Sequence, residues 1–200
     1  MSACDTFARR VLVCGFGTVV MLSCGACFAD QAPSGPVHLD VGVSYVQGLN
    51  NITNAFESEV AQSGGTTTSK VRLPIGAYVA PYFLTSFGLG LGLDFGPITV
   101  VSLGGSTSTL VPLGVDARYV FTNDDSVQPY VRVGMRDPVA SGGSLKNGKS
   151  GAFGAVGILF PRSHVGFEVA VDNSKVDVEF NGYTQTIKPL ATLISAYAHF

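Results

Sequence analysis

The 200-residue chain has little charge, no tryptophan and no cysteine beyond its N-terminal segment. Charged residues make up 13% of the sequence, against about 25% in ordinary globular proteins. The four cysteines are Cys4, Cys14, Cys24 and Cys27. Once the segment that holds them is removed, the chain needs no disulfide in an oxidising compartment. It then also has no cysteine for metal binding or nucleophilic catalysis.

Long apolar runs are also missing beyond the N-terminus. No run there approaches the roughly 18 to 20 residues that a membrane-spanning helix needs, although 46% of the residues are hydrophobic. An apolar chain of this kind is either a soluble β protein with a large core or a membrane β-barrel. The 25 glycines and the scarcity of helical patterns favour β structure. The net charge of −2 and the absence of basic clusters argue against a nucleic-acid partner.

The N-terminal segment has the pattern of a secretory signal peptide. Arg9 and Arg10 precede an apolar stretch over 11–29, and the small Cys27 stands at the third position before the expected cleavage point. We therefore predict cleavage after Ala29. The alternatives are an uncleaved membrane anchor and a lipoprotein acylated at Cys24.

Cleavage there changes the charge of the chain slightly. It removes two arginines and Asp5, which leaves 10 basic residues (12 minus 2) and 13 acidic residues (14 minus 1), a net charge of −3. A short polar lead over 30–36 then precedes the folded domain, which we expect to cover 37–200.

Eight stretches of about ten residues alternate between apolar residues and small or polar ones, as β-strands do. They cover 37–46, 70–80, 87–95, 111–119, 129–136, 151–160, 165–172 and 190–200. The stretch 87–95 is the clearest, with Phe and Leu on one face and Gly and Asp94 on the other. Pro74 cannot donate a ladder hydrogen bond, so we expect a bulge or a break there. In the Gly- and Ala-rich stretch 151–160 the sequence does not indicate which side chains point inward.

The connections between these stretches alternate strictly between long and short. The long polar segments are 48–69, 96–108, 137–150 and 173–188, and the short turns are 81–85, 122–126 and 161–164. Within the long segments, 98–101 and 176–180 have a strand-like pattern. Transmembrane barrels show this asymmetry, with short periplasmic turns and long external loops. We therefore predict an all-β fold, an eight-stranded antiparallel up-and-down transmembrane β-barrel with four long, mobile external loops.

The charges of the predicted strands fall almost wholly on one face. They are Asp40, Arg72, Asp94, Asp116, Arg118, Arg132, Arg136, Glu168 and Asp172. A charge that faces lipid at mid-depth costs about 2 to 4 kcal/mol, so this face should point into the lumen. An eight-stranded barrel is about wide enough for side chains to fill it. We predict a lumen that is plugged by ion pairs among these nine residues.

The network should form two tiers of mixed sign. Asp40, Asp116, Arg118, Arg132 and Glu168 lie towards the predicted periplasmic end, and Arg72, Asp94, Arg136 and Asp172 lie towards the outer end. Aromatic residues gather near both ends of the predicted strands, as the interfacial belts of membrane barrels do.

The last stretch ends on Phe200, with Ala198, Ala196 and Ile194 on the same uncharged face. It resembles the closing strand of bacterial outer-membrane β-barrels, which typically end on an aromatic residue. It departs from many members in having Ala198 where they carry a second aromatic. As a whole the chain resembles the small eight-stranded barrels of the opacity-protein, OmpX and OmpA-barrel class.

The resemblance implies a location and partners. It implies the outer membrane of a Gram-negative cell after cleavage near Ala29, contact with outer-membrane lipid, and an unknown extracellular partner bound through the external loops. It also implies assembly by the barrel-assembly machinery, with Phe200 as the assembly signal. The class contains adhesins, structural barrels and a few lipid A-modifying enzymes.

We expect no catalytic residue, no cofactor and no metal. A lipid A-modifying enzyme needs its catalytic groups near the outer leaflet, but His38, His164 and His199 are all expected at the periplasmic end. The Gly-Leu-Gly-Leu-Gly over 88–92 is strand alternation and no nucleotide loop, since no helix follows it. His38 and His199 should be neighbours where the barrel closes. A metal-binding or pH-sensitive pair with Asp40 is an alternative there to two interfacial residues bonded to water.

The expected function is therefore non-enzymatic. The chain should be a structural barrel, or act in adhesin-like surface interaction through its external loops. One alternative is a narrow channel for small solutes. The other is a soluble periplasmic calyx, in which the Val, Leu and Phe face lines a cavity for an apolar ligand.

Overall fold

A computed structural model describes residues 36–122, 125–181, 183–187 and 191–200. The predicted signal peptide over 1–29 and residues 30–35 of the predicted lead lie outside these ranges. In chain order the described elements are β1 (Val37–Gln47), α3 (Leu49–Gln62), β2 (Lys70–Leu73), β3 (Ile75–Leu84), β4 (Leu89–Phe95), β5 (Thr99–Leu103), β6 (Ser106–Val120), β7 (Gln128–Ser141), β8 (Leu145–Lys149), β9 (Gly151–Phe160), η2 (Pro161–Ser163), β10 (Val165–Asp172), β11 (Lys175–Phe180), β12 (Tyr183–Ile187) and β13 (Ala191–His199).

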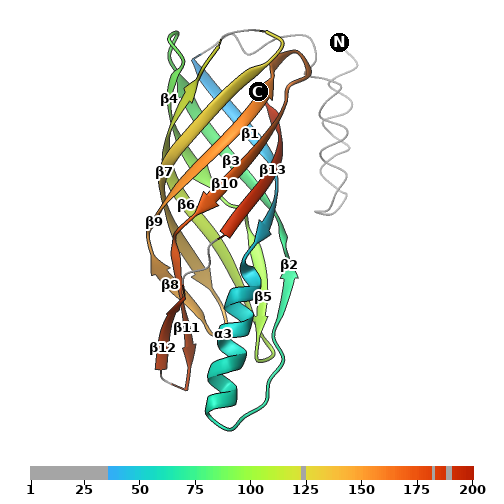
Figure 1. The fold of residues 1–200 in the computed structure, drawn as a ribbon, viewed down its shortest axis with the longest axis vertical. Helices are drawn as coiled ribbons and strands as arrows, with labels where there is room; N and C mark the ends of the chain where they lie inside the picture. Colours follow the sequence, from blue (N-terminus) through green and yellow to red (C-terminus); the bar gives the residue numbers. More distant parts are fainter. Residues whose placement is uncertain (1–35, 123–124, 182, 188–190) are drawn as a thin grey trace, which may run out of the picture. The chain divides into compact units, whose positions relative to one another are not determined.

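Eight of these strands form a closed antiparallel barrel. Their order around it is β1, β3, β4, β6, β7, β9, β10 and β13, and β13 pairs with β1 to close the ring. At the closing seam Val43 lies opposite Ala196 and Asp40 lies opposite His199. Phe200 extends this seam, since its N–H and C=O both bond to the backbone of Leu39 at 2.9 and 2.8 Å. The structure confirms the predicted eight-stranded up-and-down barrel (Figure 1).

The two faces of the wall differ sharply in chemistry. Large apolar side chains of the spanning strands point outward and are exposed, among them Leu91, Val115, Val133, Val156 and Phe167 at 54–67%. The charged faces of the same strands are buried inside. Because the apolar face points away from the lumen, the alternative of a soluble calyx with an apolar cavity is wrong for this fold. The exposed belt is the surface that a membrane barrel presents to lipid.

Most of the predicted strand boundaries agree with the structure to within a few residues. The strand is interrupted at Pro74, between β2 and β3, as predicted. The turn predicted at 81–85 is an exception, because β3 continues through Pro81 to Leu84 and the turn follows at 85–88. The unassigned strand β9 turns Phe153, Ala155 and Leu159 inward.

The long connections contain more regular structure than was predicted. Residues 48–69 were expected to form an irregular loop, but they contain the 14-residue helix α3. The other three long segments hold β5 and the outer part of β6, the outer part of β7 with β8, and the hairpin of β11 and β12. None of the described helices is long and apolar enough to span a membrane. We refer to α3, β2, β5, β8, β11 and β12 as the outer extension.

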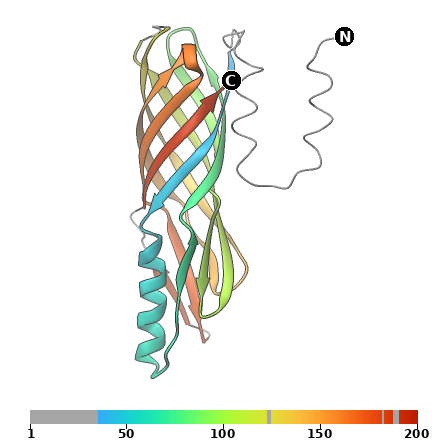
Figure 2. The same cartoon turned by 90° about the vertical axis from the view of Figure 1, so that its right-hand side faces the viewer.

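The outer extension has an apolar core of its own, at the end of the barrel opposite the short turns (Figures 1 and 2). Leu49, Ile52, Phe56 and Val60 form the buried face of α3. They belong to one cluster with Val101 and Leu103 of β5, Leu145 of β8, and Val176 and Val178 of β11. The Phe56 ring meets Phe180 edge to face, with centroids 5.6 Å apart. Packing of this kind orders the connections, so the expectation of loosely structured loops was wrong.

Candidate functional site: the charged lumen

The barrel interior holds a continuous network of charged side chains. They come from six strands, in which every second side chain points inward. Asp40 comes from β1, Asp94 from β4, Asp116 and Arg118 from β6, Arg132 and Arg136 from β7, Glu168 and Asp172 from β10, and His199 from β13. All are at most 6% exposed. Three arginines therefore meet five carboxylates inside the barrel, so every arginine is needed to balance them.

Arg132 stands at the centre of the network. Its guanidinium bonds to both oxygens of Asp116 at 3.2 and 2.9 Å and to both oxygens of Glu168 at 3.1 and 3.0 Å. Its Nη2 also donates to Asp94 at 2.9 Å. The planar fork of arginine suits such paired contacts with carboxylates. One side chain thus holds together β4, β6, β7 and β10.

The network continues towards the outer extension through Asp94. Arg136 donates to Asp94 Oδ2 from Nη2 at 2.6 Å and from Nε at 3.2 Å, and its Nη1 reaches Asp172 at 3.3 Å. The Arg136 guanidinium also lies 4.0 Å from the ring centre of Phe153. The two predicted tiers are therefore not separate, because Asp94 binds both Arg132 and Arg136.

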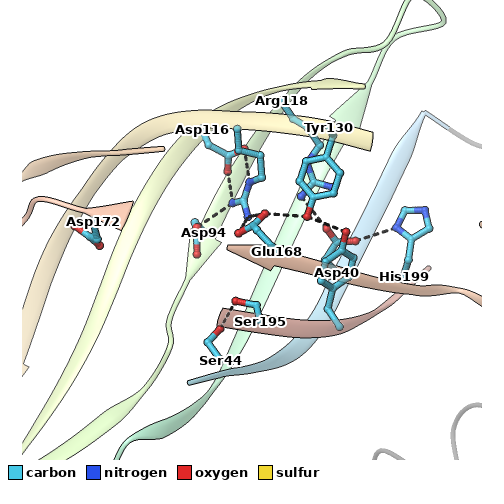
Figure 3. Close-up of polar contacts among 12 residues, drawn as sticks. Asp40, Ser44, Asp94, Asp116, Arg118, Tyr130, Glu168, Asp172, Ser195 and His199 are labelled. Carbon is cyan, nitrogen blue, oxygen red and sulfur yellow. Dashed lines mark hydrogen bonds and ion pairs between the residues drawn. The ribbon is translucent and has the colours of Figure 1, made fainter. Parts of the chain in front are cut away.

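Towards the short-turn end the network continues through aromatic side chains. Arg118 donates to Asp40 at 2.7 Å and lies over the Tyr82 ring at 3.8 Å. The hydroxyl of Tyr197 donates to Tyr130 at 2.8 Å, which donates to Glu168 at 2.9 Å. Figure 3 shows Tyr130 and Glu168 reaching towards each other across the interior. These tyrosines fill the lumen and carry the hydrogen bonding between the charged groups.

The structure brings eight of the nine predicted network residues into the lumen. Arg72 is the exception, because it lies in β2 of the outer extension and is exposed, with no ion pair to another described residue. The pairing of β2 with β5 shifts between Val71 and Leu73, so a bulge at Arg72 interrupts the alternation. Sequence reasoning did not assign Tyr82, Tyr130 and Tyr197 to the network, although all three are buried in the lumen. Tyr82 was placed in an interfacial belt. The alternation put Tyr130 on the face of Arg132 and Tyr197 on the face of His199, but neither tyrosine was given a role.

His38 and His199 do meet at the closing seam. Their rings stack with centroids 5.1 Å apart. His199 is buried, and its Nδ1 lies 2.9 Å from Asp40 Oδ1, so the interpretation of His199 as a water-bonded interfacial residue was wrong. Within the described ranges no group of three or more His, Cys, Asp or Glu side chains is arranged to hold a metal ion.

A small cavity lies beyond the network, where the lumen meets the outer extension. Its volume is about 40 Å³. Its lining is largely apolar and consists of Val46, Leu49, Ile52, Pro97, Thr99, Leu110, Pro112, Pro138, Asp172, Ser174, Val176 and Leu193. Room for a few water molecules at most remains there, since one water needs roughly 10 to 15 Å³.

Comparison with solved structures gives the same architecture. OprG of Pseudomonas aeruginosa, an outer membrane protein, superposes with a TM-score of 0.50 at 12% identity, over 83% of this chain and 96% of that one. The fold is that of a small outer-membrane β-barrel. The outer membrane protein AlkL in lipid bilayers gives a TM-score of 0.50 at 13% identity, over 83% of this chain and 89% of that one. No protein-family model and no curated protein matches the sequence. At these identities the likeness shows the fold alone, so the function of this barrel has to be inferred from its own lumen and outer extension.

Proposed function

We propose that the chain is a non-enzymatic barrel of the outer membrane whose lumen is sealed and which acts at the cell surface through its outer extension. The observation that carries the proposal is the charge network. Arg118 and Arg132 are among the largest fully buried side chains, and they meet carboxylates from strands that are not their neighbours in the ring. An ion must displace these pairs to pass.

The outer extension supports the surface role. Its core residues on α3, β5, β8 and β11 build a folded structure beyond the membrane-facing belt. A connection that served only to join two strands needs no such core. A folded surface of this kind suits the recognition of an extracellular partner, since binding residues tend to lie on loops that a rigid scaffold positions. The proposed role of Phe200 as the signal read by the assembly machinery is a separate proposal, which deletion of this residue tests.

The sealed lumen leads to a clear expectation in planar bilayers. The refolded protein should give no large and stable conductance steps, because the guanidinium and carboxylate groups occupy the lumen at its charged level. Preparations should first be checked on a denaturing gel, where a folded barrel migrates differently before and after boiling. Regular, long-lived openings of the wild-type protein in preparations that pass this check would favour the narrow channel instead.

The apolar lining of the cavity at the base of the outer extension is compatible with a second candidate, the binding of a small apolar molecule. Its volume argues against this role, since 40 Å³ is far below the roughly 150 Å³ of an apolar cavity known to take up benzene. We therefore expect no saturable rise in the unfolding temperature with benzene. A saturable rise that Ile52→Trp abolishes would instead support a ligand-binding barrel.

A further inference from the structure

Two lysines of the outer extension lie directly opposite each other on neighbouring strands. Lys149 of β8 is the cross-strand partner of Lys175 of β11. Like charges in this position destabilise a strand pair. Neither lysine makes an ion pair with any residue in the described part of the chain, whereas nearby Lys146 pairs with Glu179 at 3.2 Å. The pair is thus a local concentration of positive charge. Asp177 is the next residue on the same face of β11, but it forms no ion pair with either lysine.

The side chains of this pair point away from the apolar core. On the same two strands Val178 and Leu145 are partners and both are buried against that core. The pairing of β11 with β8 shifts between Lys175 and Asp177, but burial still alternates along β11. Val176 and Val178 are buried while Lys175 and Asp177 are half-buried, so Lys175 lies on the face opposite to Val178. Lys149 shares that face, because it is the direct partner of Lys175. Lys149 is exposed and Lys175 is half-buried, so an external group can reach both.

The height of the pair follows from β10, the spanning strand that leads to β11. Its outward row consists of Val165, Phe167, Val169 and Val171, all exposed. β10 ends at Asp172 and two residues join it to β11. Asp172 and Ser174 are buried, so the alternation persists across the join and Lys175 lies on the outward side, four residues beyond Val171. At about 3.3 Å per residue and a tilt near 45°, its Cα lies roughly 9 Å above Val171. The polar zone of a bilayer begins within this distance of the hydrocarbon edge.

We propose that Lys149 and Lys175 together bind a phosphate group on the headgroup of an outer-leaflet lipid. A phosphate placed between the two ammonium groups relieves their repulsion and accepts hydrogen bonds from both. The row of apolar side chains below them faces the acyl chains of the same lipid, which favours a lipid over a soluble anion. The inference rests on the proposed placement in the outer membrane.

The test measures the affinity of the folded barrel for diphosphoryl lipid A in detergent micelles, by native mass spectrometry. Lys149→Gln with Lys175→Gln should weaken binding about thirtyfold, since each basic residue near a charged lipid surface contributes about a kcal/mol. Lys146→Gln is the matched control, because this lysine already has a carboxylate partner, and it should change the affinity by less than about twofold. Lys149→Arg with Lys175→Arg should retain binding.

Three results would overturn the proposal. The first is that the double Gln variant binds the lipid as tightly as the wild type. The second is that Lys146→Gln weakens binding as much as the double Gln variant does. The third is that the dephosphorylated lipid binds as tightly as the phosphorylated one. A fourth would assign the site to a soluble anion, namely inorganic phosphate competing as well as the lipid. Each variant is first checked for the heat-dependent gel shift of a folded barrel. A wild-type chain that never inserts into vesicles would refute the membrane placement itself, which is a different failure from loss of lipid affinity.

Discussion

Replacing Arg132 with methionine should lower the free energy of unfolding of the barrel by about 3 to 5 kcal/mol, the usual cost of removing one partner from a buried ion pair. The substitution leaves Asp116 and Glu168 without their paired donors and removes one of the two arginines that bind Asp94. Two arginines would then face five carboxylates in the lumen. Methionine keeps much of the side-chain volume, so the loss reflects charge more than packing.

The chain has no tryptophan, so unfolding in urea is best followed by circular dichroism and by the gel shift of barrels refolded into vesicles. Arg72→Met is the matched control, because this arginine is exposed and makes no ion pair with the described residues. Its effect should stay within about 0.5 kcal/mol.

A second variant separates charge from shape. Arg132→Met combined with Asp116→Asn and Glu168→Gln removes the two carboxylates that depend most on the guanidinium. This triple variant should recover a large part of the lost stability, since burying a neutral amide costs less free energy than burying an unpaired carboxylate. If Arg132→Met alone costs under about 1 kcal/mol, the network is not what holds these four strands together.

The sequence predicts the barrel well because one rule governs its strands. Each spanning strand has one face towards the exterior and one towards a narrow interior. Apolar residues at every second position therefore predict both that a segment is a strand and which of its side chains point inward. The same rule fails at Arg72, because the pairing of β2 with β5 shifts between Val71 and Leu73 and the regular alternation of inward and outward side chains is interrupted there. It also misplaces the turn near Pro81. Pro81 has no N–H to donate, and the pairing of β3 with β4 passes from Val79 to Tyr82 without it. The strand nevertheless continues, because Pro81 lies opposite Leu39 of β1 on its other side.

Helix α3 carried a readable signal that the polar composition of 48–69 concealed. Leu49, Ile52, Phe56 and Val60 are spaced three, four and four residues apart, which is the spacing of one helix face. The intervening Asn, Ser, Thr and Glu residues suggested a loop. Except for Thr53, which is buried, they form the exposed or half-buried side of the helix, and only a few residues make up its apolar face.

The connectivity of the lumen network was beyond sequence reasoning for a different reason. The alternation along a strand shows which side chains enter the lumen, but the pairs that form depend on how strands that are not neighbours in the ring are staggered. Arg132 meets Glu168 of β10, which is separated from β7 by β9. No local pattern encodes such a contact. Tyr82 was assigned to an interfacial belt because aromatic residues near strand ends suit a belt as well as a lumen. Tyr130 and Tyr197 were placed on the inward face, but a search for ion pairs gives a tyrosine hydroxyl no role.

Gly166→Ala should destabilise the barrel by about 2 kcal/mol or more, although it adds a single methyl group. A Cβ at this inward position would overlap the end of the Tyr197 ring. That ring is buried, and it packs edge to face against Tyr78 with centroids 6.3 Å apart. Overfilling a packed interior typically costs about 1 to 3 kcal/mol. Any shift of the ring also breaks the hydrogen bond from Tyr197 to Tyr130, the link that leads to Glu168.

Gly154 provides the matched control for this prediction. A Cβ there would have Arg132 O at 4.0 Å as its nearest contact, so Gly154→Ala should be neutral within about 0.5 kcal/mol. The steric cause can be isolated with a double-mutant cycle. In a Tyr197→Ala background the ring is gone, and Gly166→Ala should then cost little. An equal cost of Gly166→Ala in both backgrounds would show that the tyrosine chain does not constrain this wall, and that the lumen is looser than its hydrogen bonds imply.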